Sequence, residues 1–225
     1  MKTVITLLLL TLISCKKDNS SQIYSTEKNE SEEIPIELPK LADWKELYSD
    51  SLVKKRFDEE LYDGTTILGV YLQNKIAEQK NRLEDLDFDN YALFFIRDHE
   101  QKWKIDNNDL KRIFDIQIKK ATVIPLNVEE AINRAYSDTT FITAEKPYLL
   151  KDYRDHKNVY SAIQLIKPFS NDHKNILVYA YNLINIKNHL IYGGYYLYFD
   201  GKESIESAMK KNDIIISEFI KANEK

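Results

Sequence analysis

The chain has 225 residues, of which 32 are basic and 36 are acidic, so its formal net charge is −4 at pH 7. This balance lacks the basic excess typical of nucleic-acid-binding domains, and we expect no nucleic-acid partner. Hydrophobic residues make up 43% of the sequence, enough for one sizeable core, whereas a mean hydropathy of −0.48 excludes a polytopic membrane protein.

A short apolar segment follows the positive start of the chain. Lys2 precedes residues 4–13, which are all apolar or threonine, and Leu12-Ile13-Ser14-Cys15 then ends in the only cysteine of the sequence. The apolar segment is about half as long as the roughly 20 residues of a membrane-spanning helix. It is typical of a secretory signal peptide. An ordinary cleaved signal followed by a stray thiol is the alternative.

Leu12-Ile13-Ser14-Cys15 resembles the lipobox of bacterial lipoproteins, and the lysines after it resemble those of Bacteroidota-type lipoproteins. The resemblance implies that residues 1–14 are removed as a signal peptide and that Cys15 is lipidated, with palmitate among its acyl chains. Lys16 resembles signals that direct a lipoprotein to the outer membrane. We therefore expect a lipid-anchored outer-membrane protein, and the leaflet that it faces, periplasmic or cell-surface, stays open.

The segment that follows Cys15 is polar. Residues 18–40 are rich in Ser, Asn, Glu and Lys and end with Pro35 and Pro39. Such a composition buries too little apolar surface to offset the entropy of ordering the chain. We expect residues 15–40 to form a lipidated cysteine and a flexible tether, and residues 41–225 to form a single globular domain.

The first half of this domain combines helical and strand patterns. Apolar residues over 41–61 follow helical spacing, with Ser49-Asp50-Ser51 as a break and a new N-cap, which predicts one or two helices. Residues 65–73 and 91–97 are runs of β-branched and aromatic residues, which predict two interior strands.

Two helices and a strand are predicted next. Residues 106–109, Asp-Asn-Asn-Asp, are able to cap a helix that carries Leu110, Ile113 and Phe114, and Asn127 is able to cap another helix. A further strand is predicted over 158–166.

The end of the chain has the strongest pattern. Residues 176–186 and 189–199 are long apolar and aromatic strands around Lys187-Asn188, and Asp200-Gly201 leads into a terminal helix with an apolar stripe. The predicted class is α+β, with an antiparallel sheet flanked by helices. The early strand, the long C-terminal hairpin and the terminal helix resemble the PsbP/Mog1 α-β-α sandwich. This resemblance has no diagnostic motif and transfers no functional residue.

A two-residue turn at Lys187-Asn188 fixes the hairpin register and gathers tyrosines on one face. The tyrosines on this face are Tyr179, Tyr181, Tyr192, Tyr196 and Tyr198. Opposite Tyr181, Gly194 leaves a gap into which the Tyr181 ring is expected to lean. An exposed tyrosine face would bind a partner protein or a glycan by stacking. The alternative is that helices cover this face and the rings are core.

Catalytic patterns are weak in this sequence. Three histidines follow aspartates, in the pairs Asp98-His99, Asp155-His156 and Asp172-His173, and these pairs would form a metal or acid-base cluster only if their loops converge. No phosphate loop, nucleophile elbow or zinc-protease motif is complete, and the only thiol is the expected lipid site. We expect no metal and no cofactor.

The sequence therefore favours a lipid-anchored, non-catalytic module that binds or assembles a partner protein or an envelope component. The alternatives are an envelope hydrolase that uses carboxylates such as Asp98, Asp155 or Asp172, and a carrier of small ligands.

Overall fold

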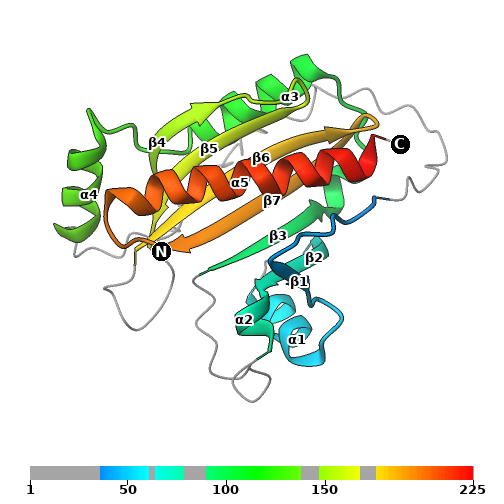
Figure 1. Cartoon of the computed structure of the whole chain (residues 1–225). Helices are drawn as coiled ribbons and strands as arrows, with labels where there is room; N and C mark the ends of the chain where they lie inside the picture. The colour runs from blue at the N-terminus through cyan, green and yellow to red at the C-terminus, as the bar shows by residue number, and fades with distance from the viewer. Residues whose placement is uncertain (1–35, 61–63, 79–89, 138–146, 168–175, 225) are drawn as a thin grey trace, which may run out of the picture. The chain divides into compact units, whose positions relative to one another are not determined.

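One seven-stranded antiparallel sheet organises the part of the chain that the computed structural model describes, which comprises residues 36–60, 64–78, 90–137, 147–167 and 176–224. The strands are β1 (Trp44–Glu46), β2 (Thr65–Gln73), β3 (Asn90–Arg97), β4 (Tyr148–Tyr153), β5 (Val159–Ile166), β6 (Leu177–Ile186) and β7 (His189–Tyr198). They lie in the order β1-β2-β3-β7-β6-β5-β4, so β1 and β4 form the two edges (Figure 1). The predicted α+β class with an antiparallel sheet is confirmed.

Capping residues start three of the helices where the sequence predicts them. The helical elements are α1 (Ser51–Glu60), α2 (Asn74–Ala77), η3 (Asp98–Glu100), α3 (Asn107–Phe114), η4 (Asp115–Lys119), α4 (Val128–Ser137) and α5 (Lys202–Asn223). Asp50 accepts a backbone N–H at the start of α1, and Asp106 and Asp109 form a capping box at α3. The Asn127 side chain accepts the N–H of Glu130 at 2.8 Å.

The C-terminal hairpin has the predicted register. Lys187 and Asn188 both have positive φ, 50° and 67°, as a two-residue type I′ turn requires. This turn places Tyr179 opposite Tyr196. The predicted tyrosine positions therefore share one face of β6 and β7.

Helix α5 packs on the other face of the same strands, as predicted. The Phe219 ring stacks on Phe94 with ring centroids 4.2 Å apart, and a Cβ placed at Gly193 would lie 3.4 Å from the Ile216 side chain. Tyr195 on this face is fully buried. The terminal helix thus closes the largest part of the hydrophobic core.

The helical prediction over 41–61 is wrong in its first half. Trp44–Glu46 forms the edge strand β1, and the N–H of Leu47 donates to the carbonyl of Val70 at 2.8 Å. The apolar spacing fits a helix, but the open edge of β2 offers backbone hydrogen bonds that the isolated segment lacks. Only the second half, α1, is helical.

The described end of the predicted tether also departs from the expectation. Ile36 and Leu38 pack against the main core cluster, and Pro39 is buried. We call residues 36–40 the strap, because they lie along the domain instead of forming a flexible tether. Residues 1–35 lie outside the described residues.

Candidate binding surfaces

Three tyrosine rings stack across three neighbouring strands on the sheet face opposite α5. Tyr196 on β7 stacks on Tyr91 of β3, with centroids 4.4 Å apart, and on Tyr179 of β6, with centroids 4.3 Å apart. The interplanar angles are 12° and 16°. The register makes the three residues cross-strand neighbours, a relationship that favours aromatic pairs.

A second aromatic stack continues this face toward the end of β3. The rings of Phe95 and Tyr192 are stacked 5.0 Å apart, and the Arg97 guanidinium lies 4.6 Å from the Tyr192 centroid. Tyr181 lies between the stacks, 5.5 Å from Tyr179 and 6.0 Å from Tyr192. We call the five tyrosines the tyrosine layer. The layer comprises Tyr91, Tyr179, Tyr181, Tyr192 and Tyr196.

The gap at Gly194 is filled by other rings than expected. A Cβ placed at Gly194 would lie 3.1 Å from a ring carbon of Tyr179 and 3.1 Å from a ring carbon of Tyr196. The prediction that the Tyr181 ring leans into this gap is wrong. Stacking of Tyr179 on Tyr196 brings both rings over the glycine, whereas Tyr181 turns toward Tyr192.

Burial separates the predicted tyrosine face into core and rim. Tyr192 is fully buried and Tyr181 is 7% exposed, Tyr179 and Tyr196 are half-buried, and Tyr198 is 42% exposed. Burial raises the pKa of Tyr196 to about 12 and raises the pKa of Tyr192 well above its usual range. Tyr181 and Tyr192 therefore belong to the core, which is the alternative that the sequence left open. A stacking surface is restricted to the more exposed rings of Tyr179, Tyr196 and Tyr198.

A buried carboxylate closes one end of the tyrosine layer. The Tyr192 hydroxyl donates to Glu100 at 2.5 Å and contacts the amide of Gln117, and Glu100 is 2% exposed. Arg97 and His99 lie 3.7 and 3.4 Å from Glu100. The carboxylate is thus held by one phenol and by positive or polar neighbours, an arrangement that stabilises a buried charge.

The predicted aspartate-histidine pairs do not form one described site. Asp98 accepts a hydrogen bond from the Thr66 hydroxyl at 2.6 Å at the end of β3, whereas Asp155 and His156 precede β5. Since β7 and β6 separate β3 from β5, the two loops are three strand spacings apart, about 14 Å. Asp172 and His173 lie outside the described residues. Among those described, no group of acidic, histidine or cysteine side chains is arranged to hold a metal ion.

A second polar network lies between the sheet and α5. Asn182 accepts from the Ser161 hydroxyl at 2.7 Å and exchanges hydrogen bonds with Asn212 at 2.8 and 3.0 Å. Asn212 also donates to the Tyr153 hydroxyl, which in turn donates to Asp213 at 2.8 Å. Burial raises the pKa of Asp213. Because these groups satisfy one another, the network positions α5 and leaves no group aimed at a ligand.

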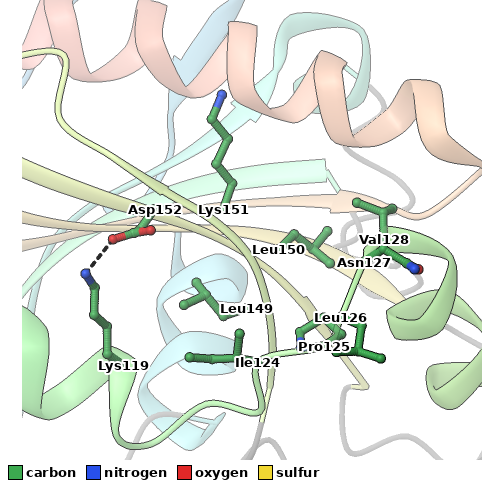
Figure 2. A pocket seen from close by; sticks show the side chains of 10 residues that line it. All are labelled: Lys119, Ile124, Pro125, Leu126, Asn127, Val128, Leu149, Leu150, Lys151 and Asp152. Atoms are coloured by element: carbon green, nitrogen blue, oxygen red, sulfur yellow. Dashed lines mark ion pairs between the residues drawn. The ribbon is translucent and has the colours of Figure 1, made fainter.

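A groove of about 290 Å³ lies beside the edge strand β4 (Figure 2). We call it the β4 groove. It is lined by Lys119, Ile124, Pro125, Leu126, Asn127, Val128, Leu149, Leu150, Lys151 and Asp152. Leu126 is 92% exposed and Ile124 is 68% exposed, the two largest exposed fractions among the large hydrophobic side chains of the described residues.

Backbone pairing explains why apolar side chains are exposed here. The Val123 N–H donates to the Pro147 carbonyl, and the Val123 carbonyl accepts from Leu149, both at 2.9 Å, as a short parallel bridge. The bridge holds the chain beside β4, and Asn127 then caps α4. Residues 124–126 are therefore held at the sheet edge, where the side chains of Ile124 and Leu126 are exposed.

An ion pair forms the polar end of the β4 groove. Lys119 lies 2.8 Å from Asp152 and 3.6 Å from Asp115 (Figure 2). Lys119 is the last residue of η4, a π-helical turn that also places Gln117 against Tyr192. Single π-helical turns are uncommon and occur frequently at functional sites.

The β4 groove was not predicted from the sequence. Tyr148–Tyr153 has three apolar residues followed by Lys-Asp, and the register shift between Leu149 and Lys151 breaks the alternation of a strand. The available signal was the apolar run Val123-Ile124-Pro125-Leu126 between two predicted helices. A solvated loop would be polar at those positions.

Comparison with known proteins gives no relative from which a role could be transferred. No family model, no curated protein and no solved structure matches the chain. None of the described helices has the length and apolar character needed to cross a bilayer.

Proposed function

We propose that the protein is a lipid-anchored binding module of the cell envelope and that the β4 groove is its binding surface. The observation that carries this proposal is the exposure of Leu126 and Ile124 beside an apolar groove. Exposed large apolar side chains that gather around a hollow are typical of interaction sites.

The partner that fits the β4 groove is an apolar segment of another protein. Its lining contains aliphatic side chains and no aromatic ring, and sugar rings bind by stacking on exposed aromatic rings. Lys119 and Asp152 neutralise each other, and the Lys151 side chain, although it belongs to the lining, points away from Ile124 and Leu126 (Figure 2). The apolar side chains at the centre of the groove favour an apolar occupant over an anion or a nucleic acid.

The partner segment binds through its side chains and does not add a strand to β4. The register of β4 against β5 shifts between Leu149 and Lys151, and an irregular edge strand is a poor template for an added strand. Val123 also occupies one part of the same edge. The groove therefore takes up apolar side chains of the partner, because Val123 already bonds to the backbone of Pro147 and Leu149 beside it.

Anchoring is proposed from the lipobox-like Leu12-Ile13-Ser14-Cys15. Cleavage before Cys15 and lipidation of its sulfur would place the domain at the outer membrane. The Cys15→Ala variant is expected to stay unprocessed and to lose incorporation of labelled fatty acid. Incorporation that persists in this variant would refute lipidation at Cys15.

The finer fold that we propose is the α-β-α sandwich of the PsbP/Mog1 kind. It is supported by α5 on one face of β7 and by the Phe114 ring of α3, which lies 5.4 Å from Tyr160 on the opposite face. An experimental structure that shows a helical layer on one face only would contradict it.

Site-specific photocrosslinking tests the binding surface in cells. A photoreactive residue in place of Leu126 is expected to give a discrete adduct, and mass spectrometry is expected to map it to an apolar segment of a partner protein. The matched control is Leu52 on α1, which is 40% exposed and lies outside the groove. An adduct with lipid or glycan, equal adducts at both positions, or no adduct at position 126 would overturn the proposal.

Point variants give a second measurement. Leu126→Glu is expected to abolish the mapped complex without lowering the melting temperature, because the side chain is almost fully exposed. Leu52→Glu is expected to leave the complex intact. If both variants bind the partner as the wild type does, the groove is not the binding surface.

A further inference from the structure

The exposed segment of residues 124–126 is held in place at both ends. At one end, Val123 forms the parallel bridge to β4. At the other end, the N–H of Leu126 donates to the Glu130 carboxylate at 2.5 Å. Pro125, between these ends, has one backbone angle fixed by its own ring. Because its backbone is already ordered, this segment loses little conformational entropy when its side chains bind a partner.

A projection and a hollow lie side by side on this surface. Leu126 is 92% exposed and therefore projects from the lining of the β4 groove (Figure 2). Leu149 belongs to the same lining and is 7% exposed, so it forms part of the base of the hollow. The surface therefore offers an apolar side chain that needs cover and an apolar hollow that Leu126 of the same chain leaves open.

The hollow is large enough for the exposed side chains of a second copy of this chain. Its volume is about 290 Å³. An engineered apolar cavity of about 150 Å³ holds a benzene molecule, which has six carbons. The side chains of Leu126 and Ile124 have eight carbons together, so both fit into the hollow of a neighbouring copy.

The charges of the lining do not oppose contact between two copies. A two-fold contact brings the same surface of each copy together, so an unpaired charge at its centre would face its own counterpart and repel it. Lys119 is paired with Asp152 at 2.8 Å. The Lys151 side chain points away from Ile124 and Leu126 (Figure 2). The apolar centres of two grooves therefore meet without enclosing an unpaired charge.

We propose that the β4 groove is a two-fold contact between two copies of this chain, in which each copy inserts Leu126 into the groove of the other, over Leu149. This inference rests on the proposed function, in which the groove binds an apolar segment, and it names that segment as residues 124–126 of a second copy. A partner that only inserts a side chain would leave Leu126 exposed. A two-fold contact uses one patch on both copies, so it fills both hollows and covers both leucines.

The contact is expected to be weak and reversible. Ten residues line the groove, whereas a standard stable interface has about 20–30 residues on each side. The dimer is therefore expected to depend on protein concentration and to exchange its copies.

Photocrosslinking between two differently tagged copies tests the contact in cells. Both full-length chains are co-expressed, a photoreactive residue replaces Leu126 in one of them, and adducts are purified under denaturing conditions through both tags. A doubly tagged adduct is expected, with the crosslink on the groove lining of the second copy. The control position is Leu52, which is 40% exposed and lies outside the groove. A crosslink from position 126 to another part of the second copy, or equal doubly tagged adducts from position 52, would overturn the two-fold contact.

Leu126→Glu distinguishes a two-fold contact from a one-sided one. In one tagged copy it is expected to weaken co-purification of the other copy, and in both copies it is expected to abolish co-purification. Sedimentation of the purified mature protein in detergent is expected to show a dissociation constant at least about tenfold higher for this variant. Leu52→Glu is expected to leave both measurements unchanged. Co-purification that persists when both copies carry Leu126→Glu would overturn the contact.

The outcomes at position 126 separate this inference from the proposed function. An adduct with an apolar segment of a different protein keeps the groove as a binding surface and overturns the second copy as its occupant. If no adduct forms at position 126, the groove is not a binding surface and both proposals fail.

Discussion

The rings of Tyr179 on β6 and Tyr196 on β7 stack with centroids 4.3 Å apart, and both rings cover Gly194 of β7. The glycine makes this pair possible, because any side chain at position 194 would point into the space that the two rings fill. The tyrosine layer is thus packed closely because the rings of Tyr179 and Tyr196 approach the backbone of Gly194.

Gly194→Ala is therefore expected to be destabilising. The added Cβ would lie 3.1 Å from both rings, and moving a stacked pair in a packed layer costs about 1–3 kcal/mol. Urea unfolding monitored by tyrosine fluorescence measures the change. The control is Tyr198→Ala, whose side chain is 42% exposed and is expected to contribute less than about 1 kcal/mol. Equal stability of Gly194→Ala and the wild type would show that the rings move apart freely.

The Tyr181→Ala variant tests whether Tyr181 is a core residue or part of a docking surface. Tyr181 is 7% exposed and contacts the rings of Tyr179 and Tyr192, so removal of its ring is expected to cost about 3–5 kcal/mol. Chemical denaturation of the single variant measures this cost. A loss below about 1 kcal/mol would place Tyr181 on an accessible surface and would restore the tyrosine face as a binding site.

Alkaline pH is expected to unfold the domain through its tyrosines. Burial raises the pKa of Tyr196 to about 12, whereas an unfolded tyrosine ionises near pH 10. Between these values the unfolded state has released the proton and the folded state still holds it, so stability falls as the pH rises. Below pH 10 both states are protonated, and this group has no effect on stability.

Denaturant melts between pH 9 and pH 12, together with phenolate absorbance, measure this dependence. The Tyr196→Phe variant lacks one of the phenols whose pKa is raised in the folded state, so its stability is expected to fall less steeply over the same range. If wild type and variant lose stability in parallel, Tyr196 ionises in the folded state as readily as in the unfolded state.

The hairpin could be predicted from sequence because its determinants are local. Lys187-Asn188 selects a two-residue turn, the turn sets the register, and the period of two then assigns each side chain to a face. Caps such as Asp106 and Asn127 were predictable for the same reason, since a capping side chain acts within three residues.

The features that were missed depend on contacts distant in sequence. Trp44 lies in a strand because β2 offers it an edge, and the strap is ordered because Asn223 lies 186 residues after Glu37. The β4 groove requires Val123 to meet Pro147 and Leu149. No local pattern in these segments indicates which distant residues they will contact. Their structure therefore depends on contacts that form only when the sheet has assembled.

Removal of the strap is the last prediction. A variant that begins at Ile36 keeps the contacts of Glu37 with Asn223, of Leu38 with Gly69 and of Pro39 with Tyr71, and we expect it to melt as the mature protein does. A variant that begins at Leu41 loses all three contacts. Each kcal/mol lost lowers the melting temperature by about 2–4 °C in a domain of this size. We therefore expect a fall of several degrees from the first variant to the second, measured by differential scanning calorimetry. Equal melting temperatures would mean that residues 36–40 contribute nothing to the folded domain, and the tether would then extend to Lys40 as the composition alone predicts.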